Sequence, residues 1–153
     1  MVSLRAVAHS ERELALAIDI GGTKMAVGLV DRRGDLIDRE SVRTDLDKRA
    51  NDLFESLAHL IRRQMQRVVE PHGGRISVVG IGSAGPIDPD CATVSPLNVP
   101  AWRRFPLKEA VADTLSDAGI TVPIHGDLEI GRAHRLNSSH ANISYAVFCL
   151  KKK

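Results

Sequence analysis

The amino-acid sequence predicts an α/β fold, with a mixed sheet in the order βββαβαβ and flanking helices. Short apolar runs built from Ala, Val, Leu and Ile alternate with two stretches of helical periodicity. Three clusters of glycine and polar residues, at 19–23, 82–86 and 126–127, each follow a predicted strand. Because ligands of such folds bind at the carboxyl ends of parallel strands, the three clusters are expected to share one site.

The first half of the chain is predicted to contain three consecutive strands and a long helix. Residues 14–18 and 25–30 are continuous apolar runs, and residues 36–42 alternate as in a half-exposed strand. The links between them are short, which favours an antiparallel meander. Residues 44–47 are expected to cap an amphipathic helix over residues 48–69.

The second half is predicted to contain two strands, a proline-rich loop and a shorter helix. Pro71, Gly73 and Gly74 are expected to end the first helix, and a buried strand follows at 76–81. Residues 94–102 form an irregular loop in which Trp102 is expected to anchor the loop on the core. A helix marked by apolar residues at 107, 111 and 115 ends near Gly119, and a short strand at 122–125 completes the fold.

Composition argues against several classes of protein. The chain has 153 residues and a net charge of +2, but residues 129–153 contribute five basic residues against one acidic residue, so residues 1–128 carry a net charge of −2. A basic nucleic-acid-binding surface is therefore not expected. Residues 1–13 lack an apolar signal core and are expected to be disordered. Two distant cysteines and the absence of a long apolar stretch predict a cytoplasmic protein that contacts no membrane.

The sequence after Leu128 has a different character. Residues 129–140 and 143–150, translated back into codons, match consecutive parts of a short-read sequencing adapter, and the three final lysines match the poly-A that follows it. The alternative is a genuine polar tail with a short terminal strand. We interpret residues 129–153 as a non-native tail and residues 14–128 as the truncated natural domain.

The first glycine cluster has the chemistry of a phosphate-binding loop. Asp19-Ile20-Gly21-Gly22-Thr23-Lys24 follows a buried strand, and its glycines allow the backbone amides to approach a phosphate closely. The spacing differs from that of a Walker A loop. The alternative is a simple hairpin that uses Gly-Gly in its turn.

Together, four segments resemble the ROK family of the actin-like ATPase (ribonuclease H-like) superfamily. Residues 19–24 resemble its first phosphate motif and residues 79–88 its second glycine motif, with Ala84 in place of proline. Residues 95–102 resemble its Asn-Leu-Pro-Gly-Trp segment, and residues 125–127 its Asn-Asp motif, with Gly126 in place of asparagine. The resemblance covers residues 14–128 and implies the N-terminal lobe of an ATPase fold.

The resemblance implies a role for each motif. Asp127 is the expected general base and Asn98 the expected partner of sugar hydroxyls. The backbone of Gly82, Ala84 and Gly85 is expected to line the sugar pocket. The loop residues expected to bind ATP are Asp19, Gly21, Gly22, Thr23 and Lys24, with Asp19 holding Mg²⁺ through water. From the residues alone, Asp127 also suits a helix N-cap, Asn98 an Asx turn and Lys24 a solvated strand edge.

The function implied is ATP-dependent phosphorylation of a hexose, with glucose first, in a protein that is homodimeric when complete. The family's second lobe, with its adenine pocket and a structural Zn²⁺ site, has no counterpart in these 153 residues. We therefore expect this fragment to be inactive. The alternatives are a sugar-sensing ROK transcriptional regulator, against which the short segment before residue 14 argues, and a sugar-binding protein without transfer.

Overall fold

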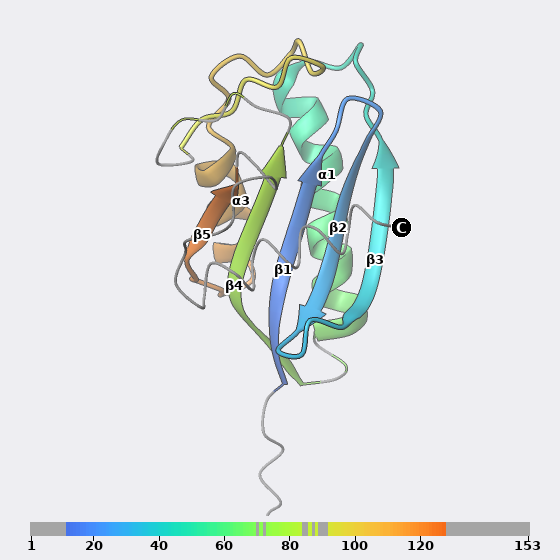
Figure 1. Ribbon diagram of the computed structural model, residues 1–153, viewed down its shortest axis with the longest axis vertical. Coiled ribbons are helices and arrows are strands. Elements are labelled where there is room, and N and C mark those ends of the chain that lie inside the picture. The colour runs from blue at the N-terminus through green and yellow to red at the C-terminus, as the bar shows by residue number, and fades with distance from the viewer. Residues whose placement is uncertain are drawn as a thin grey trace, which may run out of the picture.

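The structure, a computed structural model, describes residues 12–69, 71, 73–83, 86, 88 and 92–127. This part of the chain forms one mixed five-stranded sheet with helices on one side (Figure 1). In chain order the elements are β1 (Arg12–Ile20), β2 (Lys24–Asp31), β3 (Leu36–Arg43), α1 (Ala50–Gln64), the π-helix η1 (Met65–Val69), β4 (Gly74–Ser83), α3 (Leu107–Ser116) and β5 (Ile124–Asp127). The predicted order βββαβαβ is confirmed.

The sheet order is β3-β2-β1-β4-β5. β1, β2 and β3 form the predicted antiparallel meander, whereas β4 lies parallel to β1, and β5 lies parallel to β4. As a result β1, β3, β4 and β5 all end at the same edge of the sheet, which is the upper edge in Figure 1.

One hydrophobic core lies between the sheet and its two helices. Leu16, Ile18 and Ile20 of β1 point to this side, and α1 and α3 cover it from behind in the view of Figure 1. Burying each large aliphatic side chain of this kind contributes about 1.5–3 kcal/mol. The helical residues that share the core are Leu53, Leu57, Leu60, Ile61, Leu107, Val111 and Leu115. Within the described residues, no helix is long and apolar enough to cross a membrane.

The sheet begins earlier than the sequence predicted. Arg12 and Glu13, assigned to the N-terminal segment, are the first residues of β1 and lie in parallel register with Gly74 and Arg75 of β4. Glu13 also forms an ion pair with Arg75, which favours extending both strands. Residues 1–11 and the adapter-like segment 129–153 lie outside the described residues.

The prediction for the first helix was wrong in its start and its cap, whereas the helical segment ends at Val69 as predicted. α1 begins at Ala50, and its N-cap, Arg49, makes no side-chain capping bond. Residues 44–47 do not cap it: the carboxylate of Asp45 accepts a hydrogen bond from the amide of Asp47, and Thr44 bonds elsewhere. After Gln64 the helix widens into η1 instead of continuing as an α-helix to residue 69.

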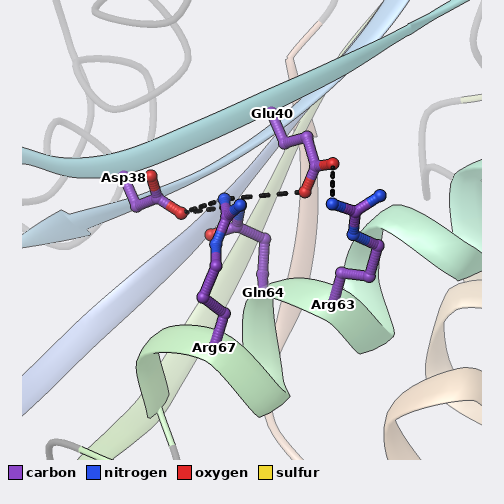
Figure 2. A network of polar contacts seen from close by, with 5 residues as sticks. All are labelled: Asp38, Glu40, Arg63, Gln64 and Arg67. Atoms are coloured by element: carbon purple, nitrogen blue, oxygen red, sulfur yellow. Dashed lines mark hydrogen bonds and ion pairs between the residues drawn. The ribbon is translucent and has the colours of Figure 1, made fainter.

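A polar network joins this helical segment to the edge strand β3 (Figure 2). Asp38 accepts hydrogen bonds from Gln64, at 3.1 Å, and from Arg67, and Arg63 lies 2.9 Å from Glu40. The hydrogen bond from Arg67 to Asp38, aided by the charges of Asp38 and Glu40, raises the pKa of Arg67. The network therefore fixes the end of α1 and the start of η1 against β3.

Candidate active site at the carboxyl edge of the sheet

Three predicted site residues lie in one row across the parallel strands. Asp19 of β1 is in register with Gly82 of β4, and Gly82 is in register with Asp127 of β5. Neighbouring strands are separated by about 4.8 Å, so the backbones of Asp19 and Asp127 lie about 10 Å apart on either side of Gly82. Asp19, Gly82 and Asp127 therefore lie at one edge of the sheet, and the expectation that the three clusters form one site stays a prediction.

The side chain of Asp19 lies on the face of the sheet opposite the helices. Its neighbours Ile18 and Ile20 are fully or almost fully buried in the core under α1, and successive residues of a strand point to opposite faces. Asp19 itself is half-buried. Within the described residues, no three His, Cys, Asp or Glu side chains gather around a metal-sized space. Mg²⁺ is commonly held by one or two carboxylates together with water and substrate phosphates, and Asp19 fits that role.

The predicted phosphate loop is a tight turn between β1 and β2. The amide of Gly21 donates to the carbonyl of Lys24 at 3.1 Å, which closes the turn. A Cβ at Gly21 would lie 2.8 Å from that carbonyl oxygen, so the turn requires glycine here. Thr23 and Lys24 are exposed. Among the described residues, the amides of Gly22 and Thr23 have no backbone acceptor, which suits an anion-binding loop.

Gly22 brings the predicted phosphate loop against the predicted sugar-binding loop. A Cβ at Gly22 would lie only 2.4 Å from the Cβ of Asn98 and 3.0 Å from its carbonyl oxygen. Asn98 is exposed, so its amide group is accessible at this point of contact. Gly22, predicted to bind ATP, is thus a direct neighbour of Asn98, predicted to bind the sugar. The two residues are 76 positions apart in the sequence.

Backbone hydrogen bonds and a buried tryptophan hold the loop that carries Asn98. Val94 and Phe105 close it through two backbone hydrogen bonds of 2.9 and 3.0 Å. Trp102 is fully buried, stacks on Phe105 with ring centroids 4.7 Å apart, and donates from Nε1 to the carbonyl of Ala50 at 3.0 Å. The expectation that Trp102 anchors the loop on the core is confirmed.

The second glycine cluster is described only in part. Gly82 is buried at the end of β4, and the two other residues predicted to line a sugar pocket, Ala84 and Gly85, lie outside the described residues. The carbonyl of Pro86 accepts a hydrogen bond from the amide of Ser95 at 2.9 Å. This bond ties the glycine cluster to the loop that carries Asn98.

Sequence reasoning missed one residue of this edge. Thr44 follows β3 and is 5% exposed. Its hydroxyl donates to the carbonyl of Gly21 at 2.7 Å, and its amide donates to the carbonyl of Thr23 at 2.9 Å. Threonine is common at helix N-caps, so the sequence favoured that role; no local pattern indicates a bond across 23 residues.

Comparison with known proteins gives one consistent result. The model of the ROK family matches residues 15–131. A glucokinase from Streptomyces coelicolor is 33% identical over 114 residues, which cover 74% of this chain and 32% of the relative. An N-acetylmannosamine kinase from Pasteurella multocida is 32% identical over 98 residues, 63% of this chain and 30% of the relative. The chain thus spans about a third of the length of these relatives.

Solved structures share the fold. A ROK family glucokinase from Streptomyces griseus, in complex with glucose and AMPPNP, superimposes with a TM-score of 0.58 at 30% identity, over 72% of this chain and 31% of the other. A ROK family transcriptional regulator, a homologue of the E. coli MLC protein, gives a TM-score of 0.60 at 15% identity, over 77% and 28% of the two chains. At that identity the second likeness concerns the fold alone.

Proposed function

The chain belongs to the ROK family, and from that premise we propose that its parent protein transfers the γ-phosphoryl group of ATP to a hydroxyl of a hexose. The observation that carries the proposal is the row formed by Asp19, Gly82 and Asp127, with Asn98 packed against Gly22 beside it. This arrangement puts an acidic residue on either side of a glycine-lined edge, next to a phosphate loop.

The phosphate loop is proposed to bind the ATP phosphates through the backbone amides of Gly22 and Thr23, with the Thr23 side chain adding a hydroxyl and Lys24 a positive charge, while Gly21 closes the turn. Asp19 would hold Mg²⁺ through water. Such an ion neutralises charge on the transferring phosphoryl group when bound. The loop's own contribution is to fix the amides before ATP arrives, which lowers the cost of reorganising them during transfer.

Asp127 is proposed as the general base. Its carboxylate accepts the proton of the attacking sugar hydroxyl as that oxygen bonds to the γ-phosphorus and the bond to the ADP oxygen breaks. The support for this role is its place at the carboxyl end of β5, level with Asp19, together with the match of residues 125–127 to the family motif.

For the sugar we propose glucose first, because glucokinases are among the relatives, and an N-acetylated amino sugar second. Asn98 would bind its hydroxyls, and Gly82, Ala84 and Gly85 would line the pocket. The presence of Gly126 where the family motif has asparagine removes one expected sugar contact.

The 153-residue chain itself is proposed to be inactive. A kinase cleft must close over its substrates to exclude water, and the described residues supply one side of it. The family match ends at residue 131, close to the Leu128 boundary that we propose for the natural sequence. In the complete protein we expect a second lobe with a structural zinc site, a homodimer and a cytoplasmic location.

The test is an assay of the full-length parent protein with ATP and a panel of glucose, N-acetylmannosamine and N-acetylglucosamine, beside the 153-residue chain. We expect ADP release that depends on one of these sugars from the parent alone. A pure parent protein that phosphorylates no hexose would overturn the proposed function, and turnover by the 153-residue chain would overturn its proposed inactivity.

Resequencing the parent locus tests the proposed origin of the tail. An open reading frame that encodes residues 137–153 would contradict its origin in an adapter.

A further inference from the structure

Thr44 holds the phosphate loop through two of its carbonyl groups. The hydroxyl binds the carbonyl of Gly21 at 2.7 Å, and the amide binds that of Thr23 at 2.9 Å. Thr44 is 5% exposed, and its side-chain bond to the half-buried Gly21 is partly buried. β3 delivers Thr44 to this position, since its last residue, Arg43, pairs with Lys24 at the start of β2.

The consequence for the loop amides follows from peptide geometry. In a planar trans peptide, the carbonyl of one residue and the amide of the next point in opposite directions. A Gly21 carbonyl fixed toward Thr44 therefore fixes the Gly22 amide on the opposite side. The bond to the Thr23 carbonyl fixes the peptide group between Thr23 and Lys24 in the same way, so both ends of the turn that contains the Gly22 and Thr23 amides are held. The carbonyls of Gly21 and Thr23, whose dipoles would repel a phosphate, therefore point toward Thr44. They are kept away from the side of the loop that faces away from Thr44.

Glycine makes such a hold necessary. The loop contains two adjacent glycines, the residue type with the greatest backbone freedom, so its own sequence does not restrict the direction of its amides. Gly22 lies against Asn98, and Thr44 holds the carbonyls of Gly21 and Thr23. The loop is thereby held by contacts with both the end of β3 and the loop that carries Asn98.

We propose that Thr44 is a positioning residue for nucleotide binding: it orients the backbone amides of the phosphate loop without contacting the nucleotide. This inference rests on the proposed function only in assigning the loop to ATP.

The test uses the full-length parent protein and compares Thr44→Val with Thr44→Ser. Valine has nearly the same shape and keeps the backbone bond to Thr23, but it removes the hydroxyl; serine keeps the hydroxyl. We expect Thr44→Val to raise the Kd and KM for ATP about fivefold to tenfold, as the loss of one buried hydrogen bond implies. The KM for the sugar stays unchanged, and Thr44→Ser behaves as the wild type.

A purely structural role predicts a different pattern. Thr44→Val would then lower the thermal unfolding midpoint with no separate effect on ATP, or would weaken ATP and sugar binding alike, and either result would overturn the proposal. Thr44→Ala, which is smaller and creates no clash, replaces Thr44→Val if the valine variant does not fold. Calorimetric titration with AMPPNP decides the question without turnover. A parent protein that binds AMPPNP but phosphorylates no hexose thus contradicts the proposed function and leaves the Thr44 test intact.

Discussion

Two polar regions along β3 are built in opposite ways. At its carboxyl end, the proposed phosphate loop is held by short hydrogen bonds from the hydroxyl and the amide of the buried Thr44 to backbone carbonyls. Farther back along the strand, Asp38 and Glu40 are held by arginines whose side chains are 48% exposed (Figure 2). The first region fixes the direction of individual peptide groups, whereas the second holds one element against another.

The two regions differ in how much displacement of their atoms each tolerates before its interactions weaken. A hydrogen bond prefers a donor–hydrogen–acceptor angle above about 150° and weakens steeply below about 120°, so a loop amide whose peptide group turns away from the phosphate loses its bond. Exposed ion pairs contribute about 0–1 kcal/mol each and adapt to small movements of long side chains. We therefore expect substitutions at the carboxyl edge to act on ligands, and those in the β3 network to act on stability.

The largest effect is expected at Asp127. In the full-length parent, Asp127→Asn removes the proposed proton acceptor and should lower kcat by on the order of 10²–10⁴. Titrations with AMPPNP and with sugar should give unchanged Kd values, since the amide has nearly the shape of the carboxylate.

Asp117→Asn is the matched control, because it makes the same change of charge at the exposed C-cap of α3 and should leave kcat unchanged. Near-normal turnover by Asp127→Asn would show that Asp127 is not the general base. Asp19 would then be the one acidic residue of the row with a proposed role.

The next effect is expected at Gly22. A Cβ here would lie 2.4 Å from the Cβ of Asn98, a distance that real Cβ atoms essentially never show. Gly22→Ala must therefore separate the two loops, at a cost of about 1–3 kcal/mol. Because both proposed ligands use this contact, steady-state kinetics should show a higher KM for ATP and for sugar.

Gly119→Ala is the control for Gly22→Ala. Gly119 has φ +74°, but a Cβ added there would meet nothing within 4 Å, so alanine is strained without a clash. The substitution should lower the thermal unfolding midpoint with both KM values unchanged. Equal KM values in Gly22→Ala and the wild type would mean that the two loops do not act together.

The elements and motifs of the carboxyl edge were predictable because their signals are local. Apolar runs ending at Asp19 and Gly82 predicted β1 and β4, and helical spacing of Leu107, Val111 and Leu115 predicted α3. Because strands joined by helical crossovers run parallel, their carboxyl ends were expected at one edge of the sheet.

The bonds that hold this edge were not predictable, because they join residues far apart in the sequence. Thr44 reaches Gly21 across 23 positions, and Trp102 reaches Ala50 across 52. The change from α1 to η1 was equally hidden: apolar spacing continues through Met65 and Val69, while Gln64 and Arg67 reach Asp38 on β3. Periodicity reports which side of a helix is buried, but it does not report the partners of its polar side chains.

The smallest effect is expected in the β3 network. Asp38→Asn in the full-length parent removes the charge that faces Arg67 while leaving an oxygen that can accept from Gln64. Since the Arg67 side chain is half exposed, water and salt already screen the pair, and the thermal unfolding midpoint should fall by only about a few degrees, less at high salt. Asp52→Asn, which breaks the more exposed pair with Arg49, should change the midpoint less.

In both variants the Kd for AMPPNP should equal that of the wild type, because neither carboxylate belongs to the bonds that fix the loop. Calorimetric titration of Asp38→Asn beside Asp52→Asn measures this directly. A weaker nucleotide affinity in Asp38→Asn, at an unchanged midpoint, would show that the contacts between β3 and α1 influence the position of Thr44. The two regions would then act as one coupled unit.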